Sequence, residues 1–169
     1  MHMNCTKPLR SAAGYALLEA LVAVVVASVG FIGAARMQTL GMALGNSAQS
    51  RQKATLLGYQ MTDRIRANRL GFLAGQYNAD PTIDLSAGDT ACLGTGCTPG
   101  QLAVADMGQW AAELAATLPS GVGKVCIDST PEDGTSALPA CDGVGNVIAV
   151  KIWWTDNVAA TRFVTMVRP

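Results

Sequence analysis

Side chains that could carry out catalysis are few in this chain, and their types exclude the common arrangements. The only histidine is His2, so removal of the first residues would exclude a Ser-His-Asp triad, a Cys-His pair and a histidine-bound metal. Glu132 and Asp133 are adjacent carboxylates, but they precede Gly134 in the segment PEDG, which is typical of a turn. We therefore expect that the chain is not an enzyme and that it binds no cofactor.

The cysteines favour disulfides over a metal site. One of the five, Cys5, lies near the start, and the other four lie in the second half of the chain: Cys92, Cys97, Cys126 and Cys141. Their spacing, C-x4-C and C-x14-C, is not a standard zinc pattern, and three loop aspartates are too widely spaced to favour calcium: Asp80, Asp84 and Asp89. An even number of cysteines in an exported domain indicates disulfides, of which three pairings are open. We favour Cys92–Cys97 and Cys126–Cys141, because each pair is local in sequence.

Glu19 is the only residue charged at neutral pH in an apolar run from Tyr15 to Ala35. The run has 21 residues, close to the roughly 20 that span a bilayer core. A carboxyl group inside the bilayer costs about 2.5–3.5 kcal/mol on insertion scales, so such a residue is a functional candidate. The structural alternative is a protonated or snorkelling carboxyl group near a helix start, where the helix dipole also favours it.

The segment before this run differs from a secretory signal peptide. Residues 1–14 are polar and basic, and a small residue, Gly14, precedes the apolar run instead of following it. Cleavage after Gly14 would therefore leave the run on the mature protein. Lys7 and Arg10 would hold the N-terminal side in the cytoplasm, so the cysteine-bearing remainder would face the oxidising side.

The stretch GYALLEALVAVVVASVGFIG, from Gly14 to Gly33, resembles the signature of type IV prepilins. The resemblance implies that a prepilin peptidase cleaves between Gly14 and Tyr15 and methylates the new N-terminal amine. It also implies that Glu19, the fifth residue after the glycine, pairs with the N-terminus of a neighbouring subunit during assembly. This chain departs from the pattern with Tyr15 in place of the usual phenylalanine and Ala16 in place of the usual threonine.

The apolar spacing after the run predicts one long helix over residues 15–70. No proline lies between residues 9 and 80, and one helix face collects apolar residues: Ala54, Leu57, Met61 and Ile65. This half should pack on a globular domain. Arg64, Arg66 and Arg69 suit the helix C-terminus, and Gly71 suits the C′ position that follows it.

The second half of the chain predicts a short helix and three strands. Residues 107–118 form the expected helix, with a capping box from Asp106 to Gln109 and a buried stack of Trp110, Leu114 and Leu118. The segments GKVCID, NVIAVKIWWTD and TRFVTMV are expected to pair as an antiparallel meander. Trp153 and Trp154 should face opposite sides of that sheet. The fold class is therefore α+β, with a long N-terminal helix, a small antiparallel sheet and a short extra helix, as in pilins.

The formal net charge of the chain is zero, but its basic and acidic residues are unevenly distributed. Residues 15–69 carry six basic and two acidic side chains, whereas residues 70–169 carry four basic and ten acidic ones. Because phosphates require lysine and arginine, an acidic C-terminal part disfavours nucleic acid as a partner. We expect a leader at 1–14, a transmembrane and assembly helix at 15–36, and an amphipathic helix half with a periplasmic head at 37–169.

Further motifs resemble the PilV family of minor pilins: DRIRANRLG, the cysteine-bearing loop, and W-x7-LPSG from Trp110 to Gly121. The resemblance implies assembly into a type IV pilus, a role in starting it, and location in the inner membrane before assembly and on the cell surface afterwards. It implies as partners the prepilin peptidase, other minor and major pilins, the pilus assembly platform, the membrane and a tip adhesin. Two alternatives stay open: a pseudopilin of type II secretion, or a single-span anchored periplasmic binding domain, which would need neither Gly14 nor Glu19.

Overall fold

The computed structural model describes residues 13–78, 92, 96–156 and 159–168. The leader to residue 12 and the three loop aspartates considered for calcium lie outside the described residues. The chain divides into two compact units, Met1–Leu44 and Gly45–Pro169, and the second unit is called the head below. Helix α1 (Ala13–Ala67) contributes its first part to one unit and its remainder to the other.

The first part of α1 is apolar on every side. Its large apolar side chains up to Leu44 are all between 50% and 83% exposed, and they include Tyr15, Leu18, Val22, Phe31 and Met37. A helix that is apolar all round has no polar face to turn toward water, which is typical of a membrane span. This helix is long and apolar enough to cross a membrane.

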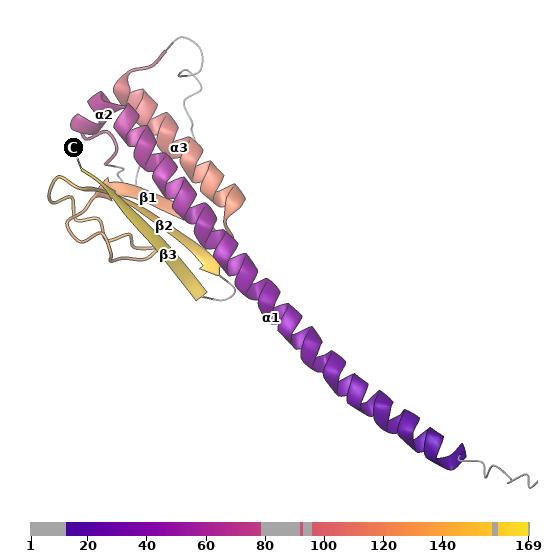
Figure 1. Cartoon of the computed structure of the whole chain (residues 1–169). Coiled ribbons are helices and arrows are strands. Elements are labelled where there is room, and N and C mark those ends of the chain that lie inside the picture. Colours follow the sequence, from indigo (N-terminus) through magenta and orange to yellow (C-terminus); the bar gives the residue numbers. More distant parts are fainter. Residues whose placement is uncertain (1–12, 79–91, 93–95, 157–158, 169) are drawn as a thin grey trace, which may run out of the picture. The chain divides into compact units, whose positions relative to one another are not determined.

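The second part of α1 contributes one face to the core of the head. Ala54, Met61 and Ile65 are fully buried, and Leu57 is almost so, which confirms the face expected from their spacing. Buried residues of the sheet that pack against this face belong to the same hydrophobic core. The fold class predicted from the sequence is therefore confirmed: α+β, with the long helix in contact with a three-stranded antiparallel sheet (Figure 1).

The predicted end of the long helix was wrong. α1 ends at Ala67, and a separate turn of helix, α2 (Arg69–Leu73), contains Gly71. The break lies at Asn68, whose side-chain oxygen accepts a hydrogen bond from Gly71 N (3.2 Å) and thereby caps α2. Gly71 is needed for close approach and not as a C′ residue, because a Cβ there would lie 2.8 Å from Pro99 O.

The extra helix is longer than predicted. α3 spans Pro99–Thr117, and its capping box joins Thr98 to Gln101 instead of joining Asp106 to Gln109. Pro99 at the first helical position favours this earlier start, since its missing N–H would have no helical partner in any case. The buried stack predicted on this helix is confirmed: Trp110, Leu114 and Leu118 are each at most 2% exposed.

The sheet has the predicted meander, in the order β1-β2-β3. β1 (Val122–Ile127) pairs antiparallel with β2 (Ile148–Asp156), and β2 pairs antiparallel with β3 (Ala159–Val167). One face packs on the helices: Trp110 Nε1 donates to Leu57 O (2.9 Å), and Gly123 leaves room for the Trp110 ring against β1. Both tryptophans of β2 are buried, and only Trp154 belongs to the helix-side core, so the opposite orientation expected of Trp153 is confirmed.

Candidate functional site

The residues of the predicted processing and assembly motif lie in the first two turns of α1. Gly14 is the second residue of the helix, and cleavage after it would make Tyr15 both the N-terminus and the first helical residue. Tyr15 is 83% exposed, and Glu19 is also exposed. Both side chains are therefore accessible on the helix surface.

Glu19 has no cation on its own helix within reach of an ion pair. The residues one turn away on either side are Tyr15, Ala16, Val22 and Ala23, none of which carries a charged side chain. Within the described part of the chain Glu19 forms no salt bridge. No side chain within one turn of the same helix can therefore pair with the carboxylate.

In the head, the four distal cysteines form two disulfides. Cys92 is joined to Cys97 and Cys126 to Cys141, which is the pairing favoured from the sequence. The second disulfide ties the end of β1 to the loop of residues 128–147, which connects β1 to β2. Gly143 N donates to Ile127 O (3.0 Å) and fixes the same loop beside the strand.

A fully buried lysine lies beneath this loop. Lys151 points away from the helix-side core, and every oxygen that its Nζ contacts belongs to the loop. Nζ lies 2.5 Å from Asp128 Oδ2 and 3.0 Å from Asp133 Oδ1, and it donates to Pro139 O (2.8 Å). Asp128 is also fully buried, and its other carboxylate oxygen accepts from Thr130 N (3.0 Å). Lys151 and the Cys126–Cys141 disulfide thus both hold the 128–147 loop to the sheet.

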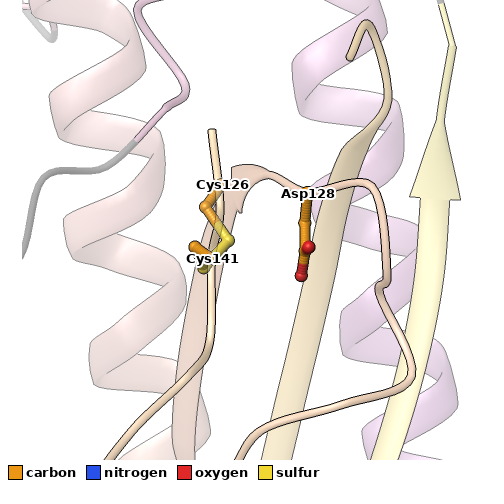
Figure 2. A group of neighbouring side chains, drawn as sticks. All are labelled: Cys126, Asp128 and Cys141. Carbon is orange, nitrogen blue, oxygen red and sulfur yellow. A yellow bond between two sulfur atoms is a disulfide. The ribbon is translucent and has the colours of Figure 1, made fainter. Parts of the chain in front are cut away.

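Cys126, Asp128 and Cys141 gather their sulfur and oxygen atoms within 4.8 Å of one another, a spacing that could suit a metal ion (Figure 2). Figure 2 shows that the two sulfurs are bonded to each other, so neither is a thiolate. The carboxylate of Asp128 in turn faces Lys151. These groups are occupied by a covalent bond and an ion pair, and the cluster is structural.

Two acidic groups of the loop have lowered pKa values. The hydrogen bond from Lys151 is the main cause that lowers the pKa of Asp133, and Thr130 adds a second hydrogen bond (2.9 Å). The hydrogen bond from the Ser129 hydroxyl lowers the pKa of Asp142, with further help from Val144 N. Each carboxylate is therefore more easily kept ionised in the folded head than in the unfolded chain.

The lowered pKa of Asp133 determines how the stability of the head changes with pH. Because the folded pKa of Asp133 lies below its ordinary value of 3.8, its pairing contributes fully above that value and is lost as the pH falls through the folded pKa. We expect Asp133→Asn to flatten the pH dependence of stability below about pH 4. Denaturant unfolding at a series of pH values, followed by tryptophan fluorescence, measures this. An unchanged pH profile in the variant would contradict the assignment.

Two features of the head were not predicted from the sequence. The first is the buried Lys151, although a lysine between Val150 and Ile152 in a strand apolar on both faces was a usable signal. The second is a polar network at Tyr77, which donates to Asp106 Oδ2 (2.6 Å) and accepts from Asn68 Nδ2 (3.1 Å). Burial, and then the bond to Asp106, raises the pKa of Tyr77. No local pattern joins these three residues, so only the fold could reveal the network.

Comparisons with protein-family models, with curated proteins and with solved structures found no match for this chain. The architecture nevertheless is pilin-like: a long apolar N-terminal helix whose second half packs on a small antiparallel sheet. The apolar helix and the two disulfides are typical of a membrane-anchored or extracytoplasmic protein.

Proposed function

We propose that this protein is a minor pilin of the type IV pilus, of the PilV type. The observation that carries the proposal is the exposed carboxylate of Glu19, five residues after Gly14, in a helix that is apolar on every side. A membrane anchor alone needs no such group, and a group this costly in a bilayer indicates a partner. The pilin-like architecture and the disulfide-bonded head support the same proposal.

In this proposal the helix has two roles, one before assembly and one after it. Before assembly it anchors the protein in the inner membrane, with the head in the periplasm. After a prepilin peptidase has cleaved behind Gly14, the helix leaves the bilayer and packs among the helices of other minor and major pilins on the assembly platform. Glu19 then meets a positive N-terminal amine where the surroundings are apolar, and the low dielectric strengthens their attraction.

Processing gives the first test of this proposal. We expect the protein extracted from membranes to begin at Tyr15, with a methylated N-terminal amine, because Gly14 follows a basic leader and precedes the apolar run. Intact-mass spectrometry of the full-length gene product measures both the cleavage and the methylation. Gly14→Leu is expected to block cleavage, whereas the matched change Gly33→Leu lies inside the helix and should leave it unaffected.

A mature protein that still begins at Met1 would contradict the pilin proposal and favour a simple membrane anchor. Cleavage after Gly14 is also expected of a pseudopilin of type II secretion, so it does not separate the two assemblies. Recovery of the processed protein in pili sheared from the cell surface separates them, since the proposal places it there.

A further inference from the structure

β3 is an edge strand of the sheet, and no other strand of the described residues pairs with its outer side (Figure 1). All nine residues of β3 pair with β2 in unbroken register, without a bulge. In an antiparallel pair, alternate residues direct their N–H and C=O groups away from the partner strand. Across the described residues, these outward groups of β3 form no hydrogen bond with any other part of the chain.

The opposite edge of the sheet, formed by β1, is capped at its end. On β1, Ile127 N donates to Asn78 Oδ1 (2.9 Å) and Ile127 O accepts from Gly143 N (3.0 Å), so its end is capped by side chain and loop. Proteins commonly protect an edge strand with proline, a bulge or several charges, because a bare edge is a template for another strand. β3 has no proline and no bulge, and Arg162 is its only charged residue.

A groove of about 340 Å³ adjoins the N-terminal half of β3. Thr135 and Ser136 of the 128–147 loop line it together with Trp153 and Arg162, which are paired across β2 and β3. Arg162 Nη1 donates to Gly134 O (3.3 Å), and Nη2 lies 3.5 Å from the carboxylate of Glu132. The Glu132 side chain is 75% exposed, so this pair is a surface contact that another carboxylate can replace at little cost.

We propose that β3 is a docking edge for an extended, acidic segment of a partner protein. The backbone of that segment adds to the sheet as a fourth strand, and one of its carboxylate side chains enters the groove and pairs with Arg162. Main-chain hydrogen bonds would supply affinity, and the groove would supply specificity, as in other cases of strand addition. The occupant is acidic because Arg162 is the only charged residue of β3 and its surface pair with Glu132 is easily exchanged for another carboxylate. The inference rests on the head alone and does not require the pilus proposal.

Two synthetic peptides test the edge. One has the sequence Thr-Val-Glu-Val-Thr-Val-Glu-Val-Thr, and the other has lysine in place of both glutamates. We expect the full chain in detergent micelles to bind the acidic peptide at least about tenfold more tightly, since a charge-assisted hydrogen bond is gained only there. Fluorescence anisotropy of labelled peptide measures the affinity, and hydrogen exchange by mass spectrometry should show new protection confined to residues 159–168.

Charge reversal at the groove gives the decisive comparison. Arg162→Glu is expected to reverse the preference to the lysine peptide, and Arg66→Glu, an exposed change on α1, should leave the preference unchanged. If Arg162→Glu lowers the stability of the head, Arg162→Gln should abolish the preference while leaving the fold intact. Protection at another segment, equal binding of the two peptides to the wild-type chain, or no binding would overturn the proposal. Protection of β3 that rises with protein concentration alone would also overturn it, because the occupant would then be a second copy of this chain.

Discussion

Replacing Asp128 with alanine is expected to lower the free energy of unfolding of the head by about 3–5 kcal/mol. The change removes the fully buried carboxylate that lies 2.5 Å from Lys151 Nζ and leaves the ammonium group buried. Asp133 and Pro139 O stay near the lysine, but the side chain of Asp133 is half exposed and compensates it only in part. Removal of one partner of a buried pair therefore costs far more than the pair contributes.

The unfolding of the head can be followed in the full chain, because all three tryptophans lie in the head and are buried there. Denaturant titration of the detergent-solubilised protein gives the free energy. The matched control is Asp63→Ala, which breaks the exposed pair with Arg66 and should cost less than about 0.5 kcal/mol.

A double variant, Asp128→Leu with Lys151→Met, distinguishes the cost of leaving a charge buried and unpaired from the cost of lost packing. It removes both charges and keeps much of the volume, so it should recover most of the stability lost in Asp128→Ala. A loss below about 1 kcal/mol in Asp128→Ala would show that water reaches Lys151 and that the 128–147 loop does not seal it.

The sequence allowed prediction of the elements whose cause is local. The spacing of Ala54, Leu57, Met61 and Ile65 repeats with the helical period, and the three strand segments lie at hairpin spacing. Each of these patterns identifies the side of its element that is buried. The two errors at helix ends have different causes. At the start of α3, the capping box from Thr98 to Gln101 with Pro99 at the first helical position is a local signal that competes with the one at Asp106. At the end of α1, the break at Asn68 goes with the close approach of Gly71 to Pro99, which no local pattern reveals.

The site residues also differ in whether a local pattern in the sequence reveals them. Gly14, Tyr15 and Glu19 are recognisable because they form a contiguous motif in an otherwise uniform run. Lys151 and its partners were not predicted as a cluster, because they come from β2 and from a loop that has no periodic pattern. The bare edge of β3 is also a property of the sheet order, which a list of strands does not determine.

Replacing Glu19 with alanine is expected to prevent assembly without preventing insertion or processing. The change removes a carboxyl group that costs about 2.5–3.5 kcal/mol in a bilayer, so insertion should be unchanged or improved. Cleavage should persist, because Gly14 and the basic leader are intact. The lost contact is the pairing with a neighbouring N-terminal amine, and no side chain within one turn of the helix can replace it. Because a charge-assisted contact in apolar surroundings is lost, incorporation should fall at least about tenfold.

The amount of this protein in sheared pili tests the central proposal most directly. Wild type, Glu19→Ala and the control Ser28→Ala would be expressed in a strain that lacks the native copy, and membrane level, N-terminus and pilus content compared. Ser28 is the matched control because it is a polar residue of the same apolar run whose hydroxyl only bonds Val24 O of its own helix (2.7 Å). We predict membrane levels no lower than wild type and equal processing for both variants, with Glu19→Ala alone lost from the pilus fraction or abolishing piliation. Wild-type incorporation and piliation of Glu19→Ala would contradict the proposal and leave Glu19 as a passive residue of a membrane anchor.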